Sequence, residues 1–357
     1  MDQIEFAAEY ESALDAAEFA NPQSAIRNPQ YLDYYRQMLL IRRTEEQIGW
    51  LFSRNLTMGT AHLSIGQEAS AVGALAATRP DDYVVSTHRG HGHLLAKGAD
   101  PARLLAEICG RVDGFCRGKG GSQHIAVREL SFLGTNGITG GGLPVATGAA
   151  LSAKLRNSGQ VVLSFFGDGA SNQGTFHEAL NMAAVWRLPI VFICENNGYA
   201  MFTPQMDVTS VADIAARAAG YAIPGVTVDG MDLLAMREAT GEAIARARAG
   251  FGPTLLEAKT YRYCGHSKSD TGTKYRTREE IAAWQTRDPL PNWRERLIAL
   301  GVEEAEIRRV EGEVEIAIEA ATAFALASPY AEDEALMGAY VESSAPRMRR
   351  EVLLAGD

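Results

Sequence analysis

The stretch from Val161 to Ala200 constrains the fold of this chain more than any other part of the sequence. An apolar run leads into Gly167-Asp168-Gly169, a helical segment follows, and a second apolar run ends in the polar turn Glu195-Asn196-Asn197-Gly198. This order predicts one βαβ unit of a parallel sheet. Ligands of open parallel sheets bind beyond the carboxyl ends of the strands. We therefore expect Asp168 and Asn197 to point into one crevice.

The chemistry of these two side chains indicates a metal. Carboxylate and amide oxygens are hard ligands, which suit Mg²⁺ carrying a phosphate compound. The glycines let the backbone approach a phosphate, and the start of the helix favours negative charge. An ordinary βαβ unit with Gly-Asp-Gly as a plain turn is the alternative. The pair Asn196-Asn197 disfavours it, because 26 residues separate this pair from Gly169, a spacing that resembles the thiamine diphosphate motif.

Length and composition favour one large α/β domain over two domains. The chain has 357 residues, 46% of them hydrophobic, which is enough for a sizeable core. We predict an N-terminal arm over residues 1–27 and a single domain over 28–357, with a helical extension from about residue 278. The formal net charge of −10 argues against a nucleic-acid partner.

The location of the protein follows from what the sequence lacks. There is no apolar run long enough to span a bilayer, and the acidic N-terminus is not a targeting segment. The four cysteines form no C-x-x-C pair and no metal spacing. We therefore expect reduced thiols, no membrane association and a cytoplasmic protein.

Further polar segments follow predicted strands or lie in glycine-rich loops. They are the segment that begins with His88-Arg89 after a strand at 82–87, the turn at 134–142 and the loop at 262–277 after a strand at 254–261. Arg89 can bind a phosphate with two N–H groups, although a surface ion pair is the alternative. His266 can donate to a phosphate or shuttle a proton. His62, in the loop 55–66, is equally compatible with a capping or core role.

Helical periodicity accounts for much of the remaining sequence. We expect a long amphipathic helix from residue 28 to about 52, and an acidic C-terminal helix whose apolar stripe packs on this chain or on another subunit. His91 and His93 stand two residues apart on a predicted turn, and we expect one of them to be structural.

Seven ordered motifs between Tyr31 and Thr277 resemble those of the E1 α subunits of thiamine diphosphate-dependent 2-oxo acid and acetoin dehydrogenase complexes. These motifs are AHLSIGQEA (61–69), STHRGHGH (86–93), GKGGSQHIA (118–126), GTNGITGGGLPVATGAAL (134–151), GDGASNQGTFHEALNMAAVW (167–186), ENNGYAM (195–201) and YRYCGHSKSD (261–270). The resemblance implies the thiamine diphosphate-binding fold: a mainly parallel sheet with helices on both faces and helical extensions at both termini.

The resemblance also implies roles for individual residues. The Mg²⁺ ligands would be Asp168, Asn197 and the main-chain carbonyl of Tyr199. Neighbours of the diphosphate would be Gly169, Ala170, Arg89 and His266. Further cofactor contacts would come from His62 and His88, and from Gly137 and Thr139 at the aminopyrimidine ring. His88 and Thr139 depart from the family pattern, in which Tyr and Val are common at these positions. Two residues would be catalytic, His62 and His266, with His266 also assisting transfer to lipoate.

The implied activity is oxidative decarboxylation of pyruvate or cleavage of acetoin through a hydroxyethyl-thiamine diphosphate intermediate. The acetyl group would pass to the lipoyl group of an E2 transacylase, with E3 completing the complex. The chain contains no convincing glutamate for activation of the cofactor, and in the family that residue belongs to a separate β subunit of an α₂β₂ heterotetramer. The alternatives are a branched-chain 2-oxo acid dehydrogenase subunit, a single-chain thiamine enzyme and a non-catalytic paralogue.

Overall fold

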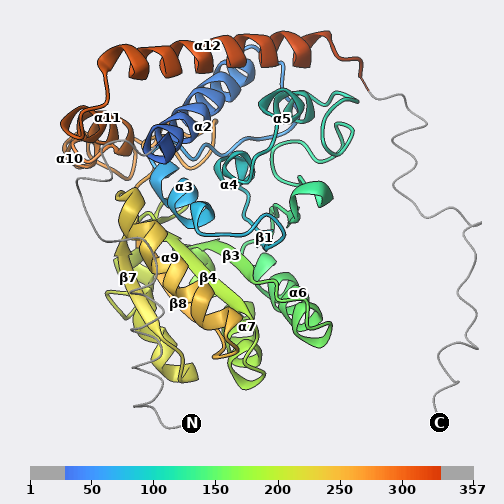
Figure 1. Cartoon of the computed structure of the whole chain (residues 1–357), viewed down its shortest axis with the longest axis vertical. Coiled ribbons are helices and arrows are strands. Elements are labelled where there is room, and N and C mark those ends of the chain that lie inside the picture. The colour runs from blue at the N-terminus through green and yellow to red at the C-terminus, as the bar shows by residue number, and fades with distance from the viewer. Residues whose placement is uncertain (1–28, 331–357) are drawn as a thin grey trace, which may run out of the picture.

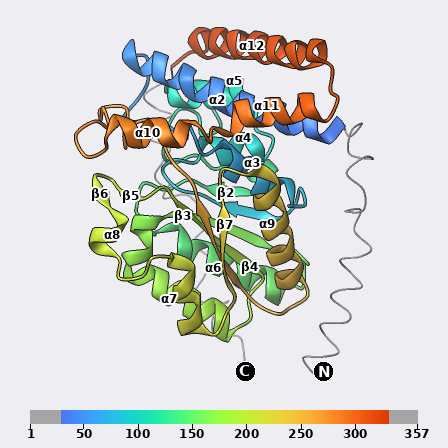
Figure 2. The same cartoon turned by 90° about the vertical axis from the view of Figure 1, so that its left-hand side faces the viewer.

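The computed structural model describes residues 29–330 of the chain. The predicted arm at 1–27 lies outside this range, as do residues 331–357 of the predicted C-terminal extension. Figures 1 and 2 show the sheet with α6 and α7 toward one end of the molecule, and α2 and α12 at the opposite end. No helix within the described range is both long and apolar enough to cross a membrane.

A six-stranded parallel sheet forms the centre of the fold, in the order β2-β1-β3-β4-β8-β7. A separate two-stranded antiparallel hairpin, β5-β6, lies after β4. The strands are β1 (Tyr83–Val85), β2 (Phe132–Gly134), β3 (Val162–Gly167), β4 (Ile190–Asn196), β5 (Tyr199–Ala200), β6 (Thr203–Pro204), β7 (Gly225–Asp229) and β8 (Thr254–Lys259). This confirms the expected α/β class with a parallel sheet.

The central strands are apolar on both faces because helices cover both faces. On β3, Leu163 and Phe165 join one core cluster, whereas Val162 and Phe166 join the other. Successive side chains of a strand point to opposite faces, so a strand buried on both sides reads as a continuous apolar run. Burial on both faces of the sheet therefore explains the apolar run at 161–166.

Each face has its own helices. One core cluster includes buried residues of α2 (Pro29–Ser53), α3 (Glu68–Ala76), α4 (His91–Ala96), α5 (Pro101–Ile108), α9 (Leu233–Arg248), α11 (Pro289–Ala299) and α12 (Glu304–Ala327). The other includes residues of α6 (Gly142–Leu155), α7 (Gly174–Val185) and the 3₁₀ helix η4 (Ile214–Tyr221). Shorter helices complete the list: η2 (Arg128–Leu130), η3 (Asp168–Asn172), α8 (Gln205–Val208) and α10 (Arg278–Gln285).

The C-terminal helix packs on the chain itself. The predicted apolar stripe of α12 is buried, and α12 contacts α2 and α5 (Figure 1). Ion pairs support the contact with α2, with Arg36 Nη2 lying 2.7 Å from Glu313 Oε2 and Arg43 Nε lying 2.6 Å from Glu315 Oε1. The two alternatives for this stripe are thus resolved in favour of an internal contact.

Two local expectations were wrong. The glycine-rich span at 114–142, expected to be a loop that ends in the turn at 134–142, contains a strand, β2, which joins the sheet beside β1. His91 and His93 lie on α4 rather than on a turn, and both are buried. In each case tertiary packing outweighed the local sequence signal.

Candidate active site

A cavity of about 370 Å³ lies at the carboxyl edge of the sheet, and residues from widely separated segments line it. The register of the strands explains this convergence, because Gly167 pairs with Glu195 and Asn196 pairs with Lys259. The segments after β1, β3, β4 and β8 therefore all begin at one edge. Every candidate residue chosen from the sequence lines this cavity: His62, His88, Arg89, Gly137, Thr139, Asp168, Gly169, Ala170, Asn197, Tyr199 and His266.

Asp168 and Asn197 present two buried oxygen atoms that lack a hydrogen-bond donor. Asp168 begins η3 directly after β3, and its Oδ2 has no hydrogen-bond partner. Asn197 follows β4 and donates through Nδ2 to Oε1 of Gln67 at 3.2 Å, which leaves its own Oδ1 without a partner. Burial raises the pKa of Asp168 to about 6. Buried acceptors without donors are costly, and a cation would offset that cost.

A close approach of backbone places the β5-β6 hairpin beside Asp168. An added Cβ on Gly169 would lie 2.7 Å from Cβ of Ala200, so only glycine allows this contact. The turn into β5 uses Gly198 at φ +83°, a left-handed conformation that favours glycine. The hydroxyl of Tyr199 donates to the carboxylate of Glu280 in α10, at 2.9 Å from either oxygen. The hairpin is thus fixed from two sides.

Arg89 is buried and joins two loops of the site. Its guanidinium donates to the carbonyl of Leu63 and, at 3.0 Å, to the carbonyl of His266. Burial, followed by the nearby charge of Arg262, lowers the pKa of Arg89 to about 10, so the side chain is still a cation at neutral pH. The alternative of a surface ion pair is wrong, because the side chain is enclosed and bonds to main-chain carbonyls.

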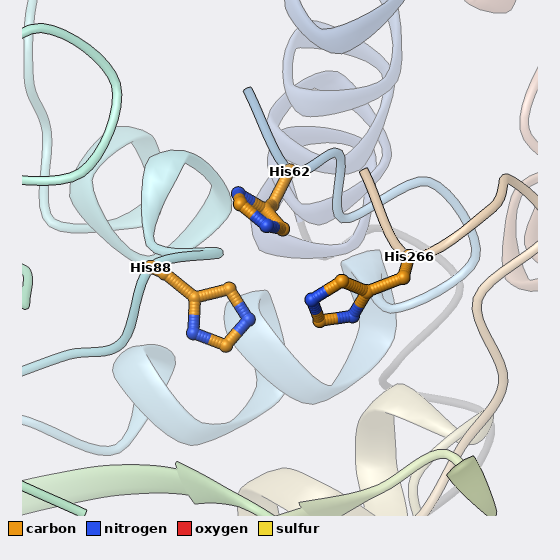
Figure 3. A group of neighbouring side chains, drawn as sticks. All are labelled: His62, His88 and His266. Carbon is orange, nitrogen blue, oxygen red and sulfur yellow. The ribbon is translucent and has the colours of Figure 1, made fainter. Parts of the chain in front are cut away.

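Three imidazole rings, those of His62, His88 and His266, lie side by side (Figure 3). The centroid of the His62 ring lies 4.7 Å from that of the His88 ring and 4.8 Å from that of the His266 ring. The centroids of the His88 and His266 rings are 5.6 Å apart. Burial, followed by the charge of Arg89, lowers the pKa of His62 to about 3, of His88 to about 2 and of His266 to about 4. All three rings are therefore neutral at physiological pH.

The surroundings of the three rings favour an anion over a metal ion. Ring nitrogens of His62, His88 and His266 lie within 4.8 Å of one another, which makes the three residues a possible set of metal ligands. However, the charges of Arg89 and Arg262 both depress the pKa of all three rings, so the local potential is positive. That potential repels a divalent cation and attracts a phosphate.

Comparison with known proteins identifies the family of this chain. The family model described as dehydrogenase E1 component matches residues 36–334. The chain is 46% identical to the pyruvate dehydrogenase E1 component subunit α of Zymomonas mobilis over 85% of this chain and 86% of the relative. It is also 46% identical to the acetoin:2,6-dichlorophenolindophenol oxidoreductase subunit α of Bacillus subtilis (85% and 91%). The human somatic mitochondrial pyruvate dehydrogenase E1 α subunit is 43% identical (88% and 80%).

The chain belongs to the dehydrogenase E1 component family. Members of this family use thiamine diphosphate. The cavity of this E1 chain fits such a group, because the unpaired oxygens of Asp168 and Asn197 suit a cation that bridges to a diphosphate. Arg89 adds a fixed positive charge. These observations support the expected roles of Asp168 and Asn197 in binding the metal and of Arg89 in binding the diphosphate. These roles remain predictions.

Several residues of the E1 cavity had no clear signal in the sequence. Gln67 orients the amide of Asn197, and Gln123 contacts His62 from the glycine-rich span. Glu195 lines the cavity, where its Oε1 accepts from Ser70 and lies 3.3 Å from Nε2 of His93. These contacts join segments far apart in the chain, so no local pattern predicts them. Glu195 stands directly before Asn196-Asn197, and that position is the one signal that pointed toward the site.

Proposed function

We propose that this chain is the α subunit of an E1 dehydrogenase that acts on pyruvate or acetoin and delivers the acetyl group to a lipoyl-bearing E2 transacylase. The enzyme is an oxidoreductase, as are the pyruvate and acetoin enzymes whose α subunits it resembles. One observation carries the proposal. A single cavity combines two buried oxygens without donors, a buried arginine and three neutral imidazoles. This set suits a metal-bound diphosphate with a reactive group beside it.

The metal and the diphosphate would occupy neighbouring parts of the cavity. We assign Mg²⁺ to Asp168 Oδ2, Asn197 Oδ1 and the main-chain carbonyl of Tyr199. Main-chain groups of Gly169 and Ala170 would contact the diphosphate at the start of η3, where backbone N–H groups are available. Arg89 and His266 would contribute donors from the adjacent loops. Main-chain groups of Gly137 and Thr139 would contact the aminopyrimidine ring.

The three histidines would act as donors and proton carriers around the bound cofactor. When bound, thiamine diphosphate supplies the electron sink for breaking the bond next to the substrate carbonyl. A diphosphate beside the rings would raise their pKa values from the depressed values of the cofactor-free cavity. His62 and His266 would then hold or release a proton near neutral pH. His88 would contact the cofactor beside them.

The cavity needs a second chain to be complete. Its lining includes two carboxylates, Asp168 and Glu195, and neither is free to activate a cofactor ring: we assign Asp168 to the metal, and Glu195 is bound to Ser70. The rim is apolar and open, with Ile138 72% exposed. Met201, Phe202, Met206 and Val208 are also exposed. We propose that a β subunit covers this rim, supplies the activating glutamate and forms an α₂β₂ heterotetramer that works with E2 and E3.

The thiols fit the expected cellular location. All four cysteines are free, and Cys109 and Cys194 are buried. Free thiols are typical of proteins in a reducing compartment, so we propose a cytoplasmic enzyme.

Activity with an artificial electron acceptor tests the proposed function. The chain would be co-purified with its β subunit, and reduction of 2,6-dichlorophenolindophenol followed with pyruvate, acetoin or 3-methyl-2-oxobutanoate. We expect turnover with pyruvate or acetoin that depends on added thiamine diphosphate and Mg²⁺. Turnover confined to 3-methyl-2-oxobutanoate would overturn the substrate assignment. Binding of the β subunit without cofactor-dependent turnover of any substrate would instead indicate a non-catalytic subunit.

A further inference from the structure

Gln123 has no role in the proposed function, yet its side chain lies inside the cavity. Its Nε2 lies 2.9 Å from Nδ1 of His62, and the residue lines the cavity beside the turn that contains Gly137. An added Cβ on Gly137 would lie 2.8 Å from Oε1 of Gln123. The carboxamide therefore extends from His62 to the turn that we assign to the aminopyrimidine ring. Its two ends touch two segments of the proposed cofactor site.

The contact with His62 determines which ring nitrogen carries the proton. An amide N–H can only donate, so Nδ1 of His62 accepts and has no proton in the neutral ring. The proton of the neutral ring then resides on Nε2. Figure 3 shows the ring of His62 beside those of His88 and His266, and all three residues line the cavity.

The backbone around Gln123 is held firmly enough to enforce this geometry. Oε1 of the buried Glu107 accepts from the N–H of Gly120 at 2.7 Å and from the N–H of Gly121 at 3.1 Å. Ser122 Oγ lies 2.9 Å from Nε2 of His91, whose Nδ1 lies 3.1 Å from Oε2 of Glu45. The three residues directly before Gln123 are thus anchored, two of them to α5 through Glu107 and the third to α2 through His91 and Glu45.

We propose that Gln123 is a positioning residue that fixes His62 as the Nε2–H tautomer, so that His62 donates a hydrogen bond to an anionic oxygen in the cavity. That oxygen belongs to the bound diphosphate or to the reacting carbonyl group. This identification of the oxygen rests on the proposed function. A neutral carboxamide is well suited to the task, because it orients the ring without adding charge. A carboxylate at this position would draw the proton to Nδ1 instead.

The other groups around His62 leave this control to Gln123. The charged and titratable groups that affect His62 are His88, His91, His266, Arg89 and Arg262. Arg89 and Arg262 favour the neutral ring. The nearby carboxylate of Glu45 is occupied by Ser64 and His91. Among the contacts that the structure describes for the ring nitrogens of His62, the one to Gln123 is the hydrogen bond that distinguishes Nδ1 from Nε2.

Two substitutions of similar volume test this role with opposite chemistry. Gln123→Met removes the donor, and Gln123→Glu replaces it with an acceptor that carries charge. Exchange of the imidazole C2 proton, followed residue by residue by mass spectrometry across pH, gives the pKa of His62 in the cofactor-loaded complex with the β subunit. We expect this pKa to rise in the order wild type, Gln123→Met, Gln123→Glu, with the last change about 1 or more. Gln285→Glu, on the exposed side of α10, is the matched charge control and leaves the pKa of His62 unchanged.

Turnover is the second readout. Loss of one oriented hydrogen bond lowers kcat roughly 2- to 10-fold in Gln123→Met. The two sources of the anionic oxygen differ in a further respect: an effect through the diphosphate raises the concentration of thiamine diphosphate needed for half-maximal activity, whereas an effect at the carbonyl lowers kcat alone.

The outcomes separate this inference from the proposed function. Equal His62 pKa values in all three proteins, or equal kcat values, would overturn the positioning role. If the ordered pKa values are found but no complex turns over pyruvate or acetoin, the proposed function fails while the control of the tautomer by Gln123 stands.

Discussion

Replacement of Asp168 by Asn should stabilise the cofactor-free protein while abolishing its response to metal. Asp168 is 3% exposed, and burial raises its pKa from 3.8 to about 6. Because the folded state holds the proton more tightly than the unfolded state, the ionised carboxylate destabilises the fold above about pH 6 and not below pH 3.8. At 1.36 kcal/mol per pKa unit, the cost near pH 8 is up to about 3 kcal/mol.

Thermal unfolding measures both effects in one assay. A gain of about 3 kcal/mol corresponds to a Tm increase of roughly 5 °C for a chain of this size. We expect Asp168→Asn to show that increase at pH 8 without cofactor, and about half of it at pH 5, which lies between the two pKa values of the carboxyl group. In complex with the β subunit, Mg²⁺ and thiamine diphosphate should raise the Tm of wild type by an amount that grows with the logarithm of ligand concentration above the Kd, but leave the Tm of the variant unchanged.

Two results would refute this reasoning. A variant with a lower cofactor-free Tm would mean that the Asp168 carboxylate already has a stabilising partner in the protein. A variant whose Tm still rises with Mg²⁺ and thiamine diphosphate would mean that Asp168 does not bind the metal. Asp81→Asn, an exposed carboxylate just before β1, is the matched control and should behave like wild type.

Three further predictions concern separate parts of the site. Glu107→Gln should lower Tm by roughly 6 °C in differential scanning fluorimetry. The buried carboxylate of Glu107 accepts hydrogen bonds from four main-chain N–H groups, those of Cys116, Gly118, Gly120 and Gly121, and the single oxygen of an amide cannot accept all four. An unchanged Tm would contradict the anchoring role of Glu107. Gly169→Ala should weaken Mg²⁺-dependent thiamine diphosphate binding at least about 10-fold in a fluorescence titration, because the new Cβ atom would lie 2.7 Å from Cβ of Ala200. Unchanged affinity would show that the β5-β6 hairpin can move freely. The free energy of unfolding of the cofactor-free chain should fall as pH drops from about 6.5 toward 4, because folding lowers the pKa values of His62, His88 and His266. In urea titrations, His88→Gln should make this free energy less dependent on pH. Equal pH dependence in the variant and wild type would place the acid sensitivity in other groups.

The convergence of Asp168 and Asn197 could be predicted because it depends only on sheet geometry. Apolar runs identify β3 and β4, and parallel pairing puts Gly167 opposite Glu195, so the residues after both strands meet at one edge. The same reasoning located the segments that carry Arg89 and His266. Glycine-rich motifs and the family resemblance supplied the remaining candidate residues, all of which line the cavity.

The supporting contacts could not be predicted, because they depend on the conformation of irregular segments. Gln123 reaches His62 across 61 positions of sequence, and Arg89 bonds to carbonyls of two loops whose paths no local pattern defines. β2 has only three residues, so it was hidden in the glycine-rich span. His91 and His93 lie on α4 because buried partners from other segments, Glu45 and Ser86, hold their rings.

Electron paramagnetic resonance of Mn²⁺ bound in place of Mg²⁺ tests the central claim most directly. The claim is that Asp168 and Asn197 hold a metal that carries the diphosphate of the cofactor. In the complex with the β subunit, we predict one tightly bound Mn²⁺ per copy of this chain in the presence of thiamine diphosphate, with ³¹P hyperfine coupling, and loss of both in Asp168→Asn. Mn²⁺ without ³¹P coupling, or coupling that survives in Asp168→Asn, would contradict the account.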